Sequence, residues 1–222
     1  MRRKIALFVQ HPQCSVQSCN GIINSLKTHY DFKLFSKHEF EDNFLSDVDL
    51  ICFPGGFGDS DSYDVLLRAN RGAICKFIAD GGRYLGICMG AYWAGSDYLD
   101  ILDDVNVEQY ITQKGACTRR PHAKNMKITW EGIPGNMFFY DGATFKGDGK
   151  YETIATYSTG YPMAIMQGKI GLIGCHPESE MHWYESYSWM RGLYHDGTHH
   201  NLLLDFVNKL MENGQDGNAA VC

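Results

Sequence analysis

A cysteine between two glycines is the first feature of this sequence that could do chemistry. Gly86, Cys88 and Gly90 form the pattern G-x-C-x-G directly after a short apolar run. A nucleophile elbow has this form: a strand ends, the chain turns sharply and a helix begins, with glycines relieving the crowding around the nucleophile. The positive end of the following helix would favour the thiolate form of Cys88. The alternative is a tight turn that merely buries a cysteine.

A second group of polar residues follows another apolar run late in the chain. Residues 170–175 lead directly into His176, Pro177 and Glu178. The proline prevents the chain from continuing as a regular ladder or helix. His176 could then accept the proton of Cys88 while Glu178 bonds the far ring nitrogen and fixes the tautomer. A lone histidine at a strand end is usually structural, but the two motifs together predict a Cys-His-Glu catalytic set.

The elements that must position these groups follow from the hydrophobic pattern. The apolar run at 4–9 predicts a buried parallel strand, the alternating segment 32–35 a second strand, and the segments 49–53 and 83–87 a third and a fourth. The pattern also predicts three helices. The first follows the cap residue Ser15 and has a core face of Val16, Cys19, Ile22, Ile23 and Leu26. The second, over 63–79, ends at Gly81-Gly82 and has a core face of Val65, Leu66, Ala69, Ile74, Phe77 and Ile78, and the third, over 200–211, has a core face of Leu203, Phe206, Val207 and Leu210. Strands that alternate with helices indicate a parallel sheet whose active site lies at the carboxyl ends of the strands.

The pattern changes after about residue 104. Short β-like segments at 127–130, 137–140, 153–157, 163–166 and 170–173 alternate with turn signals and predict antiparallel hairpins that extend the sheet. Residues 213–222 are rich in Gly and Asn and are expected to fray. No linker interrupts the chain, so one domain over residues 1–222 is expected.

The composition of the chain argues against several classes of function. A formal net charge of −6 gives no electrostatic reason to expect nucleic-acid binding. Arg119, Arg120 and Lys124 are expected to form a solvated loop, with binding of an anionic substrate group as the alternative. The 8 cysteines include no CxxC pair and several lie in apolar runs, which favours free thiols in a reducing compartment. The N-terminal apolar run is too short for a signal peptide and no segment is long enough for a membrane span, so a cytoplasmic location is expected.

Other clusters are weaker candidates for chemistry. The histidines at 182, 195, 199 and 200 lie near Glu180, Glu185 and Asp196, but Gly197 interrupts them, so polar surface or pocket lining is favoured over a metal site. The aromatic residues at 183, 184, 187 and 189 favour core packing, with some rings walling a pocket. The glycines at 55, 56 and 58 are not followed by Gly-Lys-Ser/Thr, so a nucleotide phosphate site is not expected. No metal and no cofactor is predicted.

The motifs resemble those of a known superfamily. Phe-Pro-Gly-Gly at 53–56, the segment 81–95 around Cys88 and the segment 168–178 ending in His-Pro-Glu are similar to the class I glutamine amidotransferase-like superfamily, and most similar to its biotin-protein-ligase N-terminal-domain group. The segment 139–142 resembles that group more weakly. The resemblance implies an α/β fold, a flavodoxin-like three-layer sandwich with a mostly parallel central sheet extended by antiparallel hairpins. It also implies Cys88 as nucleophile, His176 as base and Glu178 as orienter, with an oxyanion hole from the N–H of Met89 and of Gly55 or Gly56.

One residue departs from the pattern of the glutaminases. They usually carry Gln four residues after the cysteine, to hold the substrate glutamine, and this chain has Tyr92 there. No synthetase domain is attached in this sequence either. The leading hypothesis is therefore a cysteine amidohydrolase or amidotransferase that acts on a small amide through a thioester. The alternatives are a non-catalytic binding module of the same fold, or a glutaminase subunit that is active only with a separate synthetase or ligase partner.

Overall fold

The computed structural model describes residues 2–40, 43–58 and 60–213. A nine-stranded sheet crosses the molecule in the order β2-β1-β3-β4-β11-β10-β9-β6-β7. The strands of this sheet are β1 (Lys4–Phe8), β2 (Asp31–Phe35), β3 (Leu50–Phe53), β4 (Arg83–Ile87), β6 (Lys124–Trp130), β7 (Ile133–Phe139), β9 (Glu152–Tyr157), β10 (Pro162–Gln167) and β11 (Ile170–Ile173). Strands β2, β1, β3, β4 and β11 pair in parallel, and β10, β9, β6 and β7 continue the sheet antiparallel.

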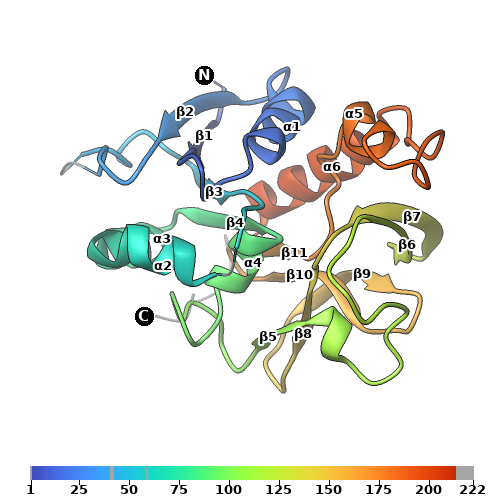
Figure 1. The fold of residues 1–222 in the computed structure, drawn as a ribbon. Coiled ribbons are helices and arrows are strands. Elements are labelled where there is room, and N and C mark those ends of the chain that lie inside the picture. The colour runs from blue at the N-terminus through green and yellow to red at the C-terminus, as the bar shows by residue number, and fades with distance from the viewer. Residues whose placement is uncertain (1, 41–42, 59, 214–222) are drawn as a thin grey trace.

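Helices cover both faces of the parallel half (Figure 1). They are α1 (Val16–Leu26), α2 (Asp61–Leu67), α3 (Arg71–Ala79), α4 (Met89–Trp93) and α6 (Thr198–Glu212). Helix α5 (Met181–Glu185) packs instead against Phe138 of β7. Helices α1 and α6 lie on one side of the sheet, and α2, α3 and α4 lie on the other. Because both faces are covered, the residues of β3 are buried without a break, as expected for a parallel strand. The flavodoxin-like three-layer arrangement predicted for the fold is confirmed.

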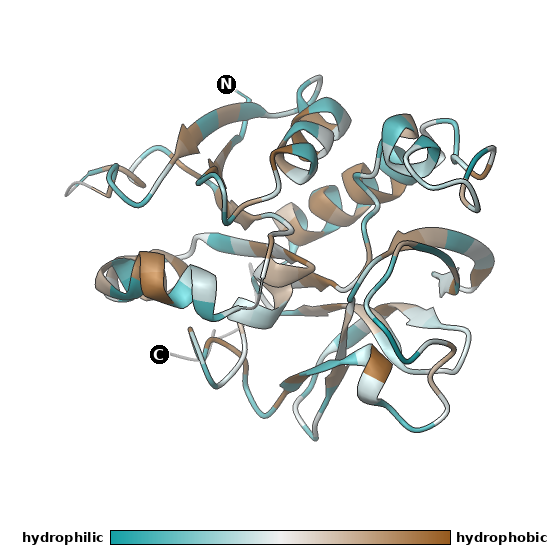
Figure 2. Cartoon of the chain, viewed as in Figure 1, coloured by the Kyte–Doolittle hydropathy of each residue, from teal (hydrophilic) through white to brown (hydrophobic). Residues whose placement is uncertain are grey.

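Helix α6 shows how a helix is fixed to the sheet. A Cβ on Gly171 of β11 would lie 2.7 Å from Cε1 of the Phe206 ring, so a glycine at this position allows α6 to pack closely on the sheet. Leu203, Val207 and Leu210 are buried on the same face, as predicted. Figure 2 shows the hydrophobic residues of α6 interleaved with hydrophilic ones, which is the pattern of a helix with one buried face.

Several predictions about single elements were wrong. The helix expected over 63–79 is divided into α2 and α3 by a 3-10 turn at Arg68–Asn70. The buried face of α2 is formed by Tyr63, Asp64 and Leu67, so Val65 lies off it and is 73% exposed, and Ala69 in the 3-10 turn is exposed, although both were assigned to the core face. Val16 was also assigned to a core face, but it lies in the first turn of α1 and is 43% exposed.

The second half of the chain also differs in detail from the prediction. Strands β5 (Asn106–Gln109) and β8 (Ala143–Lys146) form a separate antiparallel pair that the sequence pattern did not reveal. Strand β11 was expected in an antiparallel hairpin, and it does pair so with β10, but its other edge pairs in parallel with β4. This second pairing joins the strand ends that carry the two motifs.

Two further expectations concern the chain as a whole. Within the described residues, no helix is long and apolar enough to cross a membrane. Among the described residues, the cysteines at 14, 19, 52, 88, 117 and 175 form no disulfide, and Cys52 and Cys175 are fully buried as predicted. Cys222 and the expected frayed tail from 214 onward lie outside the described residues.

Candidate active site

Cys88 occupies a strained turn between β4 and α4. Its φ of 51° and ψ of −105° lie in a region that a residue with a side chain rarely adopts. The flanking glycines make this turn possible. A Cβ on Gly86 would lie 2.4 Å from the carbonyl oxygen of Gly90, and a Cβ on Gly90 would lie 2.1 Å from that of Phe53. The G-x-C-x-G pattern therefore forms the sharp strand-to-helix turn that the sequence predicted.

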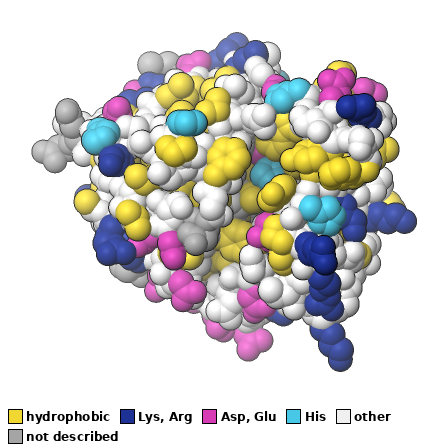
Figure 3. Space-filling model, in the orientation of Figure 1, with side chains coloured by type: hydrophobic (Ala, Val, Ile, Leu, Met, Phe, Trp, Pro, Cys, Tyr) yellow, Lys and Arg dark blue, Asp and Glu magenta, His cyan; other side chains and the backbone are white. Residues whose placement is uncertain are grey.

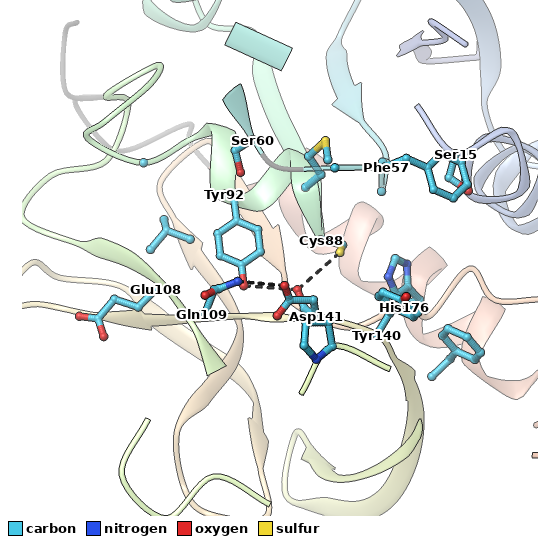
Figure 4. Close-up of a pocket in the computed structure, with 18 of the residues that line it drawn as sticks. Ser15, Phe57, Ser60, Cys88, Tyr92, Glu108, Gln109, Tyr140, Asp141 and His176 are labelled. Carbon is cyan, nitrogen blue, oxygen red and sulfur yellow. Dashed lines mark hydrogen bonds between the residues drawn. The ribbon is translucent and has the colours of Figure 1, made fainter. Parts of the chain in front are cut away.

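The parallel pairing of β4 with β11 brings the second motif beside the first. The backbone N–H of Cys88 donates to the carbonyl oxygen of Ile173 at 2.8 Å. Beyond the end of β11, the backbone N–H of His176 donates to the carbonyl oxygen of Phe138 at 2.9 Å. The chain thus holds His176 at the carboxyl end of its strand, next to Cys88 (Figure 4).

The imidazole of His176 is oriented from behind by buried groups. Its Nδ1 lies 2.9 Å from Oε1 of Glu178, which is fully buried. The hydroxyl of Ser18 in α1 donates to the same carboxylate oxygen at 2.6 Å. A Cβ on Gly21 would lie 2.1 Å from the carbonyl oxygen of Glu178, so α1 packs directly against this segment. The far ring nitrogen, Nε2, is left for Cys88.

Opposing effects set the charge of His176. Burial by itself lowers the pKa of this side chain, but the negative charges of Glu178 and Cys88, together with hydrogen bonds to both, outweigh burial and raise the pKa to about 10. An imidazolium at neutral pH is the natural partner of a thiolate. The negative charge of Glu178 therefore helps to keep the imidazole of His176 protonated beside the Cys88 sulfur.

The thiol also faces the segment that follows β7. Its Sγ lies 3.9 Å from the carbonyl oxygen of Asp141, a long contact for a hydrogen bond. The hydroxyl of Tyr92 donates to the same carbonyl oxygen at 3.3 Å, so the Tyr92 ring lies across the cavity from α4 to this loop (Figure 4). Asp141 therefore lies at the centre of the site, although the only signal for it in the sequence was the weak resemblance of the segment 139–142.

The residues predicted for an oxyanion hole lie together but are not equivalent. The N–H of Gly55 donates to the Ser18 hydroxyl at 3.0 Å and is therefore engaged. A Cβ on Gly56 would lie 2.4 Å from the sulfur of Met89, so these two residues are in close contact. Within the described residues, neither the N–H of Gly56 nor that of Met89 has a hydrogen-bond acceptor. This difference favours Gly56 over Gly55.

Cys88 and His176 open into a cavity of about 1020 Å³. Figure 3 shows the hollow on this face of the molecule, bordered by hydrophobic side chains. Trp183 and Tyr187 line it, which agrees with the expectation that rings after the His-Pro-Glu motif would wall a pocket. Arg119, Arg120 and Lys124 are absent from its lining. Sequence reasoning missed Ser18, whose only signal was its place in the first turn of a helix.

The late histidines form a cluster that is packed against the loop after Glu178. The Nε2 atoms of His195 and His200 donate to the carbonyl oxygen of Ser179 at 2.8 and 3.1 Å, and the rings of His195 and His199 stack with centroids 3.9 Å apart. Burial lowers the pKa of His195 to about 4 and that of His199 to about 3. In the described part of the chain, no group of three or more His, Cys, Asp or Glu side chains is arranged to hold a metal ion.

Comparison with solved structures defines the class to which this fold belongs. A glutamine amidotransferase from Thermotoga maritima has 13% sequence identity and a TM-score of 0.69, and the match covers 96% of this chain and all (100%) of that one. PurLQS from the same organism has 15% identity and a TM-score of 0.64, with 95% of this chain and 100% of that chain covered. A putative GMP synthase subunit from Thermoplasma acidophilum has 16% identity and a TM-score of 0.60, with 95% and 94% covered. The chain has the class I glutamine amidotransferase-like fold.

The family match covers a smaller part of the chain than the structural matches do. Residues 9–108 match the family described as biotin-protein ligase, N terminal, as the sequence motifs had indicated. That range includes Cys88 and Tyr92 but ends before His176 and Glu178. No curated protein is significantly similar to this chain in sequence.

Proposed function

We propose that this protein is a cysteine-dependent amidohydrolase or amidotransferase that acts on a small amide through a thioester on Cys88. The observation that carries the proposal is the combination of a strained Cys88, with a φ of 51°, and an imidazole beside it whose pKa is raised to about 10. Strain at a buried turn is kept where function needs it. A purely structural turn would need neither the strain nor the His176–Glu178 pair.

The proposed reaction uses the chain's own groups in two stages. The thiolate of Cys88 attacks the amide carbonyl carbon and forms a carbon–sulfur bond, and the carbonyl oxygen becomes an oxyanion. The N–H groups of Met89 and Gly56 stabilise that oxyanion. The His176 imidazolium gives its proton to the departing amine as the carbon–nitrogen bond breaks. Neutral His176 then takes a proton from water, which attacks the thioester and releases the acid and the Cys88 thiolate.

Glu178 keeps His176 in the required orientation throughout. Its Oε1 accepts from Nδ1, so Nε2 is the nitrogen that exchanges the proton with Cys88. Ser18 fixes the carboxylate in turn, because it donates to the same oxygen while accepting the N–H of Gly55. These contacts support a positioning role for both residues.

Tyr92 argues against ready hydrolysis of free glutamine. Its hydroxyl is engaged with the Asp141 carbonyl oxygen, at 3.3 Å, so it cannot replace a carboxamide that both donates and accepts. An unmet polar group on the substrate costs about 1–3 kcal/mol. A glutaminase subunit that works only with a separate synthetase or ligase is the second candidate, because solved structures of this fold include a putative GMP synthase subunit.

The proposal is tested by looking for the thioester. The protein is incubated with glutamine and with a panel of small primary amides, and intact mass spectrometry is used to detect an acyl adduct that is absent in Cys88→Ala. Ammonia release is measured in parallel, and again with Tyr92→Gln. An adduct on Cys88 with any amide supports the enzyme. Robust turnover of free glutamine by the unmodified protein would overturn the role given to Tyr92.

A non-catalytic binding module is the outcome if the thiol is inert. In that case iodoacetamide would label Cys88 no faster than Cys52 or Cys175, which are fully buried in the core. Preferential labelling of Cys88 near neutral pH is the expected result, because Cys88 alone among the three opens into the cavity beside His176.

A further inference from the structure

Aromatic rings gather on the His176 side of the active-site cavity. The rings of Phe138 and Trp183 pack edge to face on the imidazole of His176, with centroids 5.9 and 5.4 Å from it. Both rings line the cavity, as does Tyr187, which packs against the same hydrophobic cluster. Phe138, Trp183 and Tyr187 therefore form an aromatic wall that begins at the catalytic base.

The opposite side of the cavity is polar. Figure 4 shows Tyr92 and Gln109 across Cys88 from His176. The side-chain amide of Gln109 donates to the Asp141 carboxylate at 2.9 Å, and the Tyr92 hydroxyl donates to the carbonyl oxygen of the same residue at 3.3 Å. The cavity therefore has an aromatic end and a hydrogen-bonding end, with the nucleophile between them.

Exposed Phe, Tyr and Trp rings occur only around this cavity in the part of the chain that the structure describes. They are Phe57, Tyr140 and Trp189, which are 61%, 48% and 61% exposed. Phe57 and Tyr140 line the cavity, and the Trp189 ring lies 5.3 Å from that of Tyr187 in the aromatic wall. Such a concentration of exposed rings at one cavity is typical of a ligand-binding surface.

The cavity is larger than a primary amide needs. Its volume of about 1020 Å³ is at the upper end of the range for pockets that enclose a drug-sized ligand, about 300–1,000 Å³. The reacting amide group occupies only the space beside Cys88 and the oxyanion hole. Ammonia, the leaving group of a primary amide, would leave the aromatic wall without a contact.

The proposed reaction determines which half of the substrate meets the aromatic wall. The His176 imidazolium protonates the departing nitrogen, so that nitrogen lies within hydrogen-bond reach of Nε2. A substituent on this nitrogen extends toward Phe138 and Trp183, whose rings pack on the same imidazole. The acyl group lies on the opposite side of Cys88, toward Tyr92.

We propose that the substrate is a secondary amide whose amine half carries an aromatic ring, which binds against the aromatic wall while a small acyl group faces Tyr92. The Cys88 sulfur bonds to the carbonyl carbon, the carbon–nitrogen bond breaks, and the amine leaves with the proton of His176. Water then hydrolyses the thioester. The inference rests on the proposed function, because it names the substrate class of the same site.

The test uses two isomeric amides that differ only in the half that carries the ring. The N-benzyl amide of acetic acid has the ring on the amine half, and the N-methyl amide of phenylacetic acid has it on the acyl half. Each is added at increasing concentration, and protection of Cys88 from iodoacetamide is followed by mass spectrometry. Protection measures binding even where turnover is slow, and release of benzylamine or methylamine is measured in parallel.

The expected preference is large enough to measure. Burial of one phenyl ring changes affinity about ten- to a hundredfold, so the N-benzyl amide should protect Cys88 at a concentration at least about tenfold lower than its isomer does. Tyr187→Ala removes one ring of the wall and should reduce this preference about threefold or more. Tyr194→Ala is the matched control, because Tyr194 packs against the same cluster but does not line the cavity, and it should leave the preference unchanged.

Each remaining outcome has a definite meaning. Equal protection by the two isomers, or protection by neither, overturns the aromatic amine half, and the proposed function stands if Cys88 still alkylates faster than buried Cys52. Stronger protection by the phenylacetic amide shows that the ring binds on the acyl side and overturns the proposal. An undiminished preference in Tyr187→Ala overturns the assignment to the aromatic wall. If Cys88 alkylates no faster than Cys52, the proposed function fails and this inference falls with it.

Discussion

Replacing Glu178 with Gln removes the negative charge of this side chain but nearly keeps its size and shape. The carboxylate is fully buried, lies 2.9 Å from Nδ1 of His176 and accepts the Ser18 hydroxyl at 2.6 Å. A carboxamide has almost the same size, and its oxygen can still accept from Nδ1. Glu178→Gln therefore removes one negative charge and leaves the orientation of the imidazole largely in place.

The size of the effect follows from that geometry. Two unit charges about 4 Å apart at an effective dielectric of about 20 interact by about 4 kcal/mol, equivalent to about three pKa units. Losing this interaction would bring the pKa of His176 from about 10 back toward the ordinary value of 6.5. The positive charge of His176 beside the Cys88 sulfur would then be largely lost at neutral pH. We expect alkylation of Cys88 by iodoacetamide at pH 7 to slow by about 10- to 100-fold.

The assay is the rate of Cys88 alkylation, measured by mass spectrometry between pH 5 and pH 9. The wild-type rate should exceed the Glu178→Gln rate by the largest factor near pH 7, where the wild-type imidazole of His176 is protonated and that of the variant is largely neutral. Ser18→Ala serves as a control that keeps the charge and removes one hydrogen bond, and it should slow alkylation less. Equal rates and equal pH profiles for wild type and Glu178→Gln would refute the ion-pair reasoning.

Three further predictions concern stability and are read from urea unfolding. Cys88→Gly should be more stable than Cys88→Ala by about 1–2 kcal/mol, because only glycine relaxes the strained turn; equal stabilities would mean that the turn stores no strain. Gly90→Ala should lower the unfolding free energy by several kcal/mol, because its Cβ would lie 2.1 Å from the Phe53 carbonyl oxygen. The control Gly72→Ala in α3, whose Cβ would meet nothing within 4 Å, should raise the unfolding free energy by about 0.5–1 kcal/mol. The folded-state pKa of His176 is raised to about 10. The stability that its protonation contributes is therefore fully present below the unfolded pKa of about 6.5 and is lost as pH rises through about 10. The difference in unfolding free energy between wild type and His176→Gln should shrink over that pH window, and a constant difference would contradict the raised pKa.

The parts of the fold that depend on local pattern could be predicted from the sequence. The continuous apolar runs of β1, β3 and β4 identified buried parallel strands because residues on both faces must be hydrophobic there. The motifs at Cys88 and His176 were predicted to meet because a cysteine elbow and a His-Pro-Glu segment, each after an apolar run, together suit a Cys-His-Glu catalytic set. Their proximity in the structure follows from the β4–β11 pairing.

What the sequence could not predict depends on contacts between distant segments. Ser18 looks like any polar residue in a helix, and its role appears only when α1 packs on the loop after β11. Strands β5 and β8 carry charged and polar residues, so no apolar alternation revealed them. Asp141 stands at the centre of the cavity only because the antiparallel half of the sheet brings the end of β7 back to α4.

The position of β11 in the sheet has a consequence for the order of events during synthesis. The edge of β4 (Arg83–Ile87) is completed by a strand that leaves the ribosome only after residue 173, following all the other described strands. Until then a nascent chain presents β4 as an open edge, which is a template for unwanted pairing. Cys88 likewise has no imidazole of His176 beside it until the same strand docks. Completion of this edge of the sheet and placement of His176 beside Cys88 are therefore one event.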